Sequence, residues 1–473
     1  MTSYIAPVEH DTAEPAYRPF TLDEVGDQQQ RQSELLLTMA QMLSDVGEIC
    51  EAGKRVQASV SSTLQDVVGR LERIEKTLQL SARHASVSQQ GRIRCLFLVH
   101  HPAAWAATRE IVDVMRHSHD FEPVIMSLPH RFPLVRRMGG EEEVHAMLQA
   151  QGYPHIRIRD EEQHAALERI KALAPALVFR QAPWDDDIPD CLSADKLAFT
   201  RLCYVPYGYM TARIERHQFD QTLHRLAWRI FCPDDLHQQL CAEYNVFGGI
   251  NCRVTGYPKF DHLARHIGTT GTWPIPHHGG LPTYRLIWAP HFAYQGDWLK
   301  FGVFDRIAAD MLALAQTHPT LQIVMRPHPA LREAMQAAAP GTGLATFLSQ
   351  WLAQSNTAMS TEQEYADLFA ASDALLTDGL SFFSEYQLFD KPLIFFEREG
   401  HSGFNAAGER LVPGMYRVQT MNAFTSLLSQ LTQGHEVPEI AEARRRIARA
   451  LRPYPGQAAL RIVDTIRREW ASA

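Results

Sequence analysis

Polar side chains follow several of the buried strands that the sequence predicts, at the point where each strand ends. His100 and His101 follow an apolar run at 93–99, and Arg180 ends a run at 176–180. Ligands of open α/β sheets bind at the carboxyl ends of the strands, so these side chains are candidates for a binding site. Four further segments hold the same position: 204–209, 290–291, 326–329 and 378–381.

The residue types at these positions suit transfer from a diphosphate-activated donor. Such a reaction needs cations or N–H dipoles where charge builds on the leaving phosphate, and Arg326 supplies a cation. It also needs a base beside the acceptor hydroxyl, a task that histidine performs near neutral pH. His291 and His328 are the candidates, although either could instead donate a hydrogen bond to the phosphate. A structural role is the competing interpretation, because the chain has 22 histidines.

The stretch 365–396 reads as helix, buried strand, polar turn, helix and second buried strand. Thr377, Asp378 and Ser381 lie in the turn, and a helix is predicted to start near Ser381. The N-terminus of that helix would present free N–H groups and the positive end of a helix dipole, both of which bind phosphate. An ordinary turn between a strand and a helix is the alternative interpretation.

Strands alternating with helices position these residues in two successive blocks. The pattern runs through 92–267 and again through 281–437, and two helices that cross back to the first domain are expected in 438–473. A segment rich in Gly, Pro and Thr, 268–282, separates the blocks. We therefore expect an α/β protein of two Rossmann-like domains whose parallel sheets face a cleft, the outline of a GT-B transferase. The chain has no G-x-G-x-x-G segment, so no dinucleotide site is indicated.

A segment without proline, 28–82, precedes the first domain. Residues at alternating steps of four and three form a mostly apolar stripe in it, the seam of a coiled coil. We expect a homo-oligomer through this helix; the alternative is an amphipathic helix folded back on the enzyme body. Residues 1–27 are expected to lack fixed structure, and 82–91 to form a linker. The seam comprises Met39, Leu43, Val46, Cys50, Gly53, Gln57, Val60, Leu64, Val67, Leu71, Ile74 and Leu78, of which only Gly53 and Gln57 interrupt the apolar stripe.

Composition excludes several classes of function. The net charge of −8 leaves no excess of cations for binding nucleic acid. No signal peptide opens the chain and no apolar run is long enough to span a bilayer. We therefore expect a cytoplasmic protein, with any membrane contact peripheral and at the inner face of the cell membrane. The seven cysteines are widely spaced without a C-x-x-C pair, which indicates reduced core residues.

No metal cluster and no cofactor are predicted. His277 and His278 fall in the segment between the two blocks, and the acidic run 185–187 reads as a solvated turn. The chain has neither a P-loop nor a G-x-S-x-G segment.

Ordered motifs over about 200–466 resemble the CDP-glycerol glycerophosphotransferase family. The segment 254–261 (VTGYPKFD) resembles the G-x-P-(K/R)-x-D segment that closes the first domain in that family, and 287–291 (IWAPH) its opening strand of the second domain. The turn 326–329 (RPHP) is similar to (K/R)-x-H-P. The segments 376–386 and 391–392 parallel the family's T-D-Y-S-S…F-D-Y and K-P.

The resemblance implies a GT-B enzyme that moves glycerol phosphate from CDP-glycerol to an acceptor hydroxyl of a teichoic acid or capsule and releases CMP. It also implies that His328 serves the reacting phosphate, and that Thr377, Asp378 and Ser381 lie at the donor diphosphate. We expect donor-binding and catalytic groups in the second domain and a glycan or lipid-linked acceptor in the first. The expected site comprises His328, His291 and Asp378 as catalytic residues, Arg326, Thr377, Ser381, Glu385 and Pro290 at the donor, and His101, Arg180, Tyr207 and Lys259 at the acceptor.

The chain departs from the family pattern in three places. A histidine usual in the first domain is missing from 204–209, Gly379-Leu380 replaces Tyr-Ser, and Glu385 replaces an aspartate. His291 or His101 could then act as the base. Two other hypotheses remain open: a GT-B glycosyltransferase using a nucleotide sugar, and an inactive GT-B-like scaffold assembled by its coiled coil.

Overall fold

The computed structural model describes residues 22–85, 91–131, 137–276, 283–292, 299–339, 341–362 and 364–471. The chain divides into two compact units, Met1–Glu75 and Lys76–Ala473, and each is described by itself. The predictions for residues 1–21 and for His277 and His278 lie outside the described residues.

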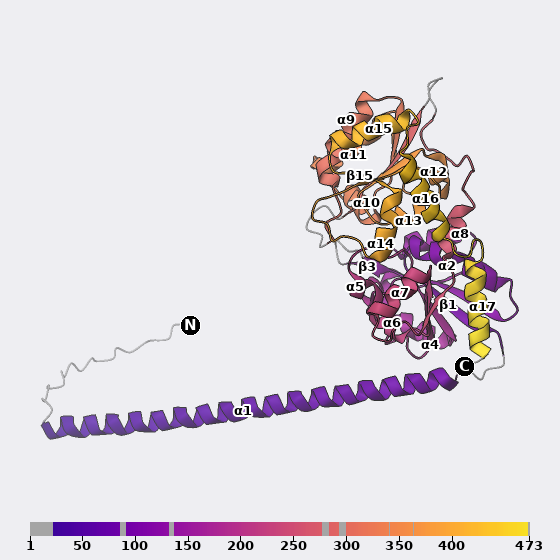
Figure 1. Cartoon of the computed structure of the whole chain (residues 1–473). Coiled ribbons are helices and arrows are strands. Elements are labelled where there is room, and N and C mark those ends of the chain that lie inside the picture. Colours follow the sequence, from indigo (N-terminus) through magenta and orange to yellow (C-terminus); the bar gives the residue numbers. More distant parts are fainter. Residues whose placement is uncertain are drawn as a thin grey trace, which may run out of the picture. The chain divides into compact units, whose positions relative to one another are not determined.

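The first unit contains most of a single helix, α1 (Leu22–Ala85), of 64 residues (Figure 1). The helix begins before the predicted start at Gln28, so the expectation that 22–27 lack fixed structure is wrong. Ion pairs between residues three or four positions apart, such as Lys54–Glu51 and Arg70–Asp66, lie on its surface. No helix among the described residues is both long and apolar enough to cross a membrane.

The second unit opens with a parallel seven-stranded sheet. Its strand order is β5-β2-β1-β6-β7-β8-β9. Apolar runs such as Leu96–Val99 are fully buried, as strands covered on both faces require. The strands are β1 (Ile93–Val99), β2 (Phe121–Ser127), β5 (Ile156–Arg157), β6 (Leu177–Arg180), β7 (Arg201–Tyr204), β8 (Arg229–Cys232) and β9 (Cys252–Val254). The helices that follow them include α2 (Pro102–Arg116), α3 (Glu141–Ala150), α4 (Ala166–Leu173), α5 (Glu215–Phe219), α6 (Thr222–Leu226), α7 (Asp235–Tyr244) and α8 (Pro258–Ala264).

A second parallel sheet of six strands follows, in the order β12-β11-β10-β13-β14-β15. Numbered from its own first strand, this order is 3-2-1-4-5-6, that of a Rossmann sheet. Ligands of such sheets bind where the order reverses, here beside β10 and β13. The strands are β10 (Tyr284–Ala289), β11 (Leu321–Met325), β12 (Thr357–Met359), β13 (Ala374–Thr377), β14 (Leu393–Phe396) and β15 (Tyr416–Val418). Its helices include α9 (Phe304–Thr317), α10 (Pro329–Gln336), α11 (Gly343–Leu352), α12 (Ala366–Ala371), α13 (Phe383–Gln387), α14 (Ala406–Leu411) and α15 (Met421–Thr432).

The last two helices connect the two sheets. On α16 (Pro438–Ala450), Arg444 binds Asp390 and Glu436 of the second domain. α17 (Ala458–Ala471) packs against α2 and α8 of the first domain (Figure 1). Both oxygens of the Asp261 carboxylate accept backbone N–H groups at the start of α17, from Gly456 at 2.8 Å and Ala458 at 3.0 Å. The chain therefore returns to the first domain at its end.

Candidate active site at the carboxyl ends of the strands

Two histidines of the second domain lie side by side at neighbouring strand ends. The His328 backbone N–H donates to the Pro290 carbonyl at 2.9 Å, which ties the turn after β11 to the turn after β10. The imidazole centroids of His291 and His328 are 5.1 Å apart. Burial lowers the pKa of His291 to about 4, and burial followed by the neighbouring His291 and His101 lowers that of His328. Both rings are therefore neutral near pH 7.

Capping fixes the tautomer of His328. The residue is the N-cap of α10, and its Nδ1 accepts the Ala330 N–H at 3.2 Å. Because a neutral imidazole that accepts at one nitrogen carries its hydrogen on the other, Nε2 of His328 is the N–H donor. Such a donor suits a phosphate oxygen, the role that the RPHP turn implies.

His101 approaches from the first domain. It is the N-cap of α2, where its Nδ1 accepts the Ala104 N–H at 3.3 Å, and its ring meets Tyr207 edge-on at 5.1 Å. Burial, then the nearby His130 and Lys259, lowers the pKa of His101 to about 3. Because a charge on His101 also lowers the pKa of His328, the structure brings these two predicted residues from different domains together.

A buried network joins the domains beside the histidines. The Lys259 ammonium donates to the Glu385 carboxylate at 2.6 Å, and both side chains are buried. Burial acts to lower the pKa of Lys259, but the charge and hydrogen bond of Glu385 together with the nearby Tyr257 and Tyr207 outweigh burial, and the pKa is raised. The Tyr365 hydroxyl donates to the other oxygen of Glu385, and the Arg326 guanidinium lies 4.6 Å from the Tyr365 ring centroid. Glu385, predicted at the donor, thus binds Lys259 and Tyr365.

Arg326 is held in position by the loop after β12. Its Nη1 donates to Ser360 Oγ at 3.1 Å and to the Glu362 carbonyl at 2.8 Å. Burial lowers its pKa, but a guanidinium stays charged at any physiological pH. The structure therefore provides a fixed cation in the turn after β11 that also carries His328.

Asp378 binds backbone rather than facing open space. One carboxylate oxygen accepts the His291 N–H and the other the Val303 N–H, both at 2.6 Å. Burial raises the pKa of Asp378 to about 7, although these N–H groups act against the rise. The predicted catalytic residue thus braces the turn that carries His291.

Two further residues predicted at the diphosphate, Thr377 and Ser381, lie in the same turn. The Thr377 hydroxyl, expected at the diphosphate, is buried and donates to the Ala289 carbonyl at 2.8 Å. The helix expected from Ser381 is the five-residue α13, which begins at Phe383 without a side-chain cap. A helix this short provides little dipole, and Ser381 itself is exposed. The short helix follows from packing, since all five residues of α13 are buried.

Arg180 is also committed elsewhere. The buried guanidinium pairs with Asp185 and donates to the carbonyls of Ala182 and Trp184. The acidic run 185–187 is only partly solvated: Asp186 is exposed, whereas Asp185 binds Arg180 and accepts the Ala194 N–H, and burial raises the pKa of Asp187 to about 6. These contacts anchor the loop after β6, and the acceptor-side role of Arg180 stays a prediction.

Sequence reasoning missed Tyr365 and the close contact between Gly379 and His291. A Cβ on Gly379 would stand 2.8 Å from His291 Cδ2. The departure from the family pattern at Gly379 is thus tied to His291, because the imidazole occupies the space that a side chain at 379 needs. Tyr365 has no signal in the sequence, since its partners Glu385 and Arg326 meet it only through the fold.

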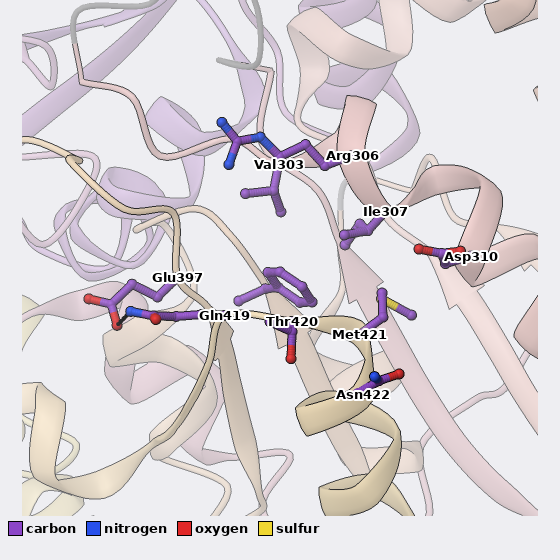
Figure 2. A pocket seen from close by; sticks show the side chains of 10 residues that line it. Val303, Arg306, Ile307, Asp310, Glu397, Gln419, Thr420, Met421 and Asn422 are labelled. Carbon is purple, nitrogen blue, oxygen red and sulfur yellow. Dashed lines mark hydrogen bonds between the residues drawn. The ribbon is translucent and has the colours of Figure 1, made fainter.

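A cavity of about 350 Å³ lies further along the same sheet edge, at the ends of β14 and β15. Val303, which also binds Asp378, lines it together with Arg306, Phe396 and Glu397. The Gln419 amide donates to Glu397 at 3.4 Å across its wall (Figure 2). None of the residues predicted at the site lines this cavity.

One described group has the composition of a metal site. The Sγ atoms of Cys232, Cys241 and Cys252 lie within 4.8 Å of one another, all buried. All three are free thiols in the core, as expected of reduced core cysteines. Their distance along the chain is why no sequence spacing indicated the group.

Residues 230–468 match the family model described as CDP-Glycerol:Poly(glycerophosphate) glycerophosphotransferase. The match spans more than half of the 473 residues. The chain belongs to this glycerophosphotransferase family. Members of this family are transferases that use a nucleotide-activated donor. The match shows that this chain is a transferase and that its donor is nucleotide-activated. The expected resemblance is confirmed.

Solved structures agree on the fold. The chain is similar to the wall teichoic acid polymerase TagF (TM-score 0.52, 13% identity, 86% of this chain and 96% of that one). It is also similar to the UDP-GlcNAc 2-epimerase from Neisseria meningitidis bound to UDP-GlcNAc (TM-score 0.56, 15% identity, 79% of this chain and 100% of that one). A third similar structure is a putative UDP-N-acetylglucosamine 2-epimerase from Listeria monocytogenes (TM-score 0.53, 15% identity, 81% of this chain and 98% of that one). At these identities the likeness shows a GT-B-like fold, as predicted. No curated protein matches the chain.

Proposed function

We propose that this glycerophosphotransferase family member moves glycerol phosphate, or a related polyol phosphate, from a CDP-activated donor to an acceptor hydroxyl. The product is a surface polysaccharide or teichoic-acid-like polymer, and CMP leaves. The observation that carries the proposal is the pairing of His291 with His328 at neighbouring strand ends of the second domain, where a charge on His101 of the first domain also lowers the pKa of His328. This arrangement matches the needs of a phosphoryl transfer, which are positioning and charge stabilisation.

In the proposed reaction the acceptor oxygen attacks the β-phosphorus of the donor. The new O–P bond forms as the bond from that phosphorus to the CMP oxygen breaks. His328 donates its Nε2 hydrogen to a phosphate oxygen, and the fixed charge of Arg326 stabilises the leaving phosphate. His291, neutral near pH 7, takes the proton of the acceptor hydroxyl, and a bound diphosphate strengthens it as a base because nearby negative charge raises the pKa of an imidazole. Asp378 positions His291 through the backbone.

The acceptor enters from the first domain under this proposal. His101 and Tyr207 form the facing wall, and Lys259 holds the second domain at the correct distance through Glu385. A glycan or lipid-linked acceptor would bring the enzyme to the inner face of the cell membrane as a peripheral protein. We also propose that the chain works as a homo-oligomer through residues 28–82.

A donor panel tests the proposal. The protein is incubated with CDP-glycerol, CDP-ribitol and nucleotide sugars, and released CMP or nucleoside diphosphate is measured. We expect CMP from a CDP-polyol. Turnover of a nucleotide sugar alone would contradict phosphotransfer and favour a glycosyltransferase, the alternative suggested by the altered turn at Gly379 and Leu380.

Variants of the histidines separate catalysis from folding. His328→Ala is expected to lower kcat by 100-fold or more, because a donor to the developing charge is lost. His435→Ala, an exposed histidine in the same domain, is the matched control and should keep full activity. A thermal shift with CMP that is lost in Arg326→Ala would argue against the inactive scaffold.

A further inference from the structure

The apolar stripe on α1 lacks a partner within the first unit. In heptad notation the stripe places Leu36, Leu43, Cys50, Gln57, Leu64 and Leu71 at a, and Met39, Val46, Gly53, Val60 and Val67 at d. The large apolar members of this set are between 47% and 71% exposed. An apolar seam of this length on an isolated helix is unfavourable in water, and burying each Leu or Val gains about 1.5–3 kcal/mol.

The residue types at a and d select the number of helices. Leucine occupies most a positions, and β-branched valine occupies d at 46, 60 and 67. Parallel dimers prefer the opposite choice, β-branched residues at a and leucine at d, whereas leucine at a with a β-branched residue at d shifts the preference to higher assemblies. The seam of α1 therefore disfavours a dimer.

The flanking g positions support the same conclusion. Leu35, Met42, Ile49 and Val56 stand at g in four successive heptads and are exposed. They widen the apolar stripe beyond the a/d seam that a two-stranded coil buries. In a four-stranded coil the g residues lie against neighbouring helices and are buried. In a two-stranded coil the same g residues remain exposed to water.

The e positions fix the direction. In a parallel coil the g residue of one helix meets the e residue five positions later on its neighbour. Leu35 then meets Ala40, Met42 meets Gly47 and Val56 meets Ser61, so a large side chain packs against a small one at three of the four levels; at the fourth, Ile49 meets Lys54. An antiparallel coil pairs g with g and sets large side chains against each other.

We infer that α1 assembles with three further copies of itself into a parallel, in-register four-stranded coiled coil. Gln57, the polar residue at a, sits at one level of the bundle and fixes the register, as single polar a residues do. This inference rests on the proposed self-association and is independent of the donor. All four chains leave the bundle at the same end, so four catalytic units gather there.

The mass of the full-length protein, measured by light scattering after gel filtration, tests the stoichiometry. We expect four times the 53.5 kDa of one chain. Leu43→Asp with Leu64→Asp should give a monomer, and Ser44→Asp, at the exposed b position beside Leu43, should stay tetrameric. Exchanging the core, with Ile for the four leucines at a and Leu for the three valines at d, should give a dimer without loss of helix.

Oxidation of Cys50 tests the direction. Cys50 is exposed, whereas the other cysteines are buried or half-buried. A parallel bundle brings the Cys50 thiols to one level, so mild oxidation should link chains into covalent dimers, and Cys50→Ser should abolish the link. An antiparallel bundle centred on Gln57 separates the thiols by about 14 residues, roughly 21 Å at the helical rise.

The outcomes separate the two proposals. A dimer or trimer mass overturns the four-stranded inference and leaves self-association standing, while a monomer overturns both. A tetramer without a Cys50 link overturns the parallel arrangement. CMP release by the monomeric variant is measured separately, so failure of the assembly is not mistaken for failure of the proposed reaction.

Discussion

At the scale of single residues, the polar groups after the strands divide into those that face the site and those that build it. In the proposed mechanism Arg326, His328 and His101 face the substrates. Asp378 and Thr377 instead form hydrogen bonds with backbone groups of neighbouring turns. The division follows from geometry across strands. Asp378 lies 75 and 87 positions from the N–H groups that it binds, so a sequence pattern marks it as polar without showing its partners.

Asp378→Asn is predicted to lower the free energy of unfolding by about 1–3 kcal/mol, because an amide oxygen replaces only one of two acceptors for buried N–H groups. Urea denaturation measures this, with the exposed Asp305→Asn as control. Equal stability of Asp378→Asn and the wild type, with lost activity, would return Asp378 to direct catalysis.

The same pair of proteins should differ in pH dependence. The folded pKa of Asp378, about 7, lies above its ordinary value near 4, so the folded state binds the proton more tightly than the unfolded chain. The contribution of Asp378 to stability is therefore fully present below pH 4 and falls as the pH rises toward 7, by at most about 1.4 kcal/mol per unit. Between pH 4 and pH 7 the free energy of unfolding of the wild type should therefore fall relative to that of Asp378→Asn, which has no carboxyl group at this position to titrate.

Gly379→Ala is predicted to lower activity by about tenfold or more with little change in stability. Its Cβ would stand 2.8 Å from His291 Cδ2 and displace the ring. If the effect acts through His291, adding Gly379→Ala to His291→Ala should cost nothing further. Additive losses in this double-mutant cycle would contradict the coupling.

At the scale of elements, the strands were predictable and the partnerships of the short helices were not. Buried runs such as 93–99 and 393–396 are apolar because both faces of a parallel sheet are covered, and that signal is local. β5 and β12 are two and three residues long, too short for any periodicity. α13 is defined by burial against the rest of the domain, so the sequence indicated a helix there but misplaced its start and its role.

The contact between α8 and α13 gives a prediction for the domain interface. Lys259→Met leaves the Glu385 carboxylate buried without its cation, which costs about 3–5 kcal/mol. Adding Glu385→Gln removes that charge, and the double variant should recover most of the stability because the cost lies in the unpaired charge. Chemical denaturation of the three variants measures this; a double variant less stable than Lys259→Met would show that the pair itself stabilises the interface.

At the scale of the whole molecule, the 64-residue helix α1 precedes the two α/β domains. The family match begins at residue 230, and every residue of the proposed site follows α1, so we propose that α1 serves assembly rather than the transfer step. In the parallel bundle it gathers four sites at one end. When one site of an assembly binds a multivalent partner, the neighbouring sites meet that partner at an effective concentration set by how the sites are linked. A polymer with many acceptor ends is a multivalent partner.

The monomeric variant Leu43→Asp/Leu64→Asp is therefore predicted to separate two activities. On a short soluble acceptor its turnover per chain should equal that of the wild type, since both substitutions lie on α1 and outside the proposed site. On a long polymeric acceptor at limiting concentration its turnover should fall by about tenfold or more, because one chain cannot remain bound through its neighbours. Ser44→Asp should behave as the wild type on both. Equal loss on the two acceptors would mean that the assembly supports the catalytic unit itself, and no loss on either would leave the bundle without a part in handling the polymer.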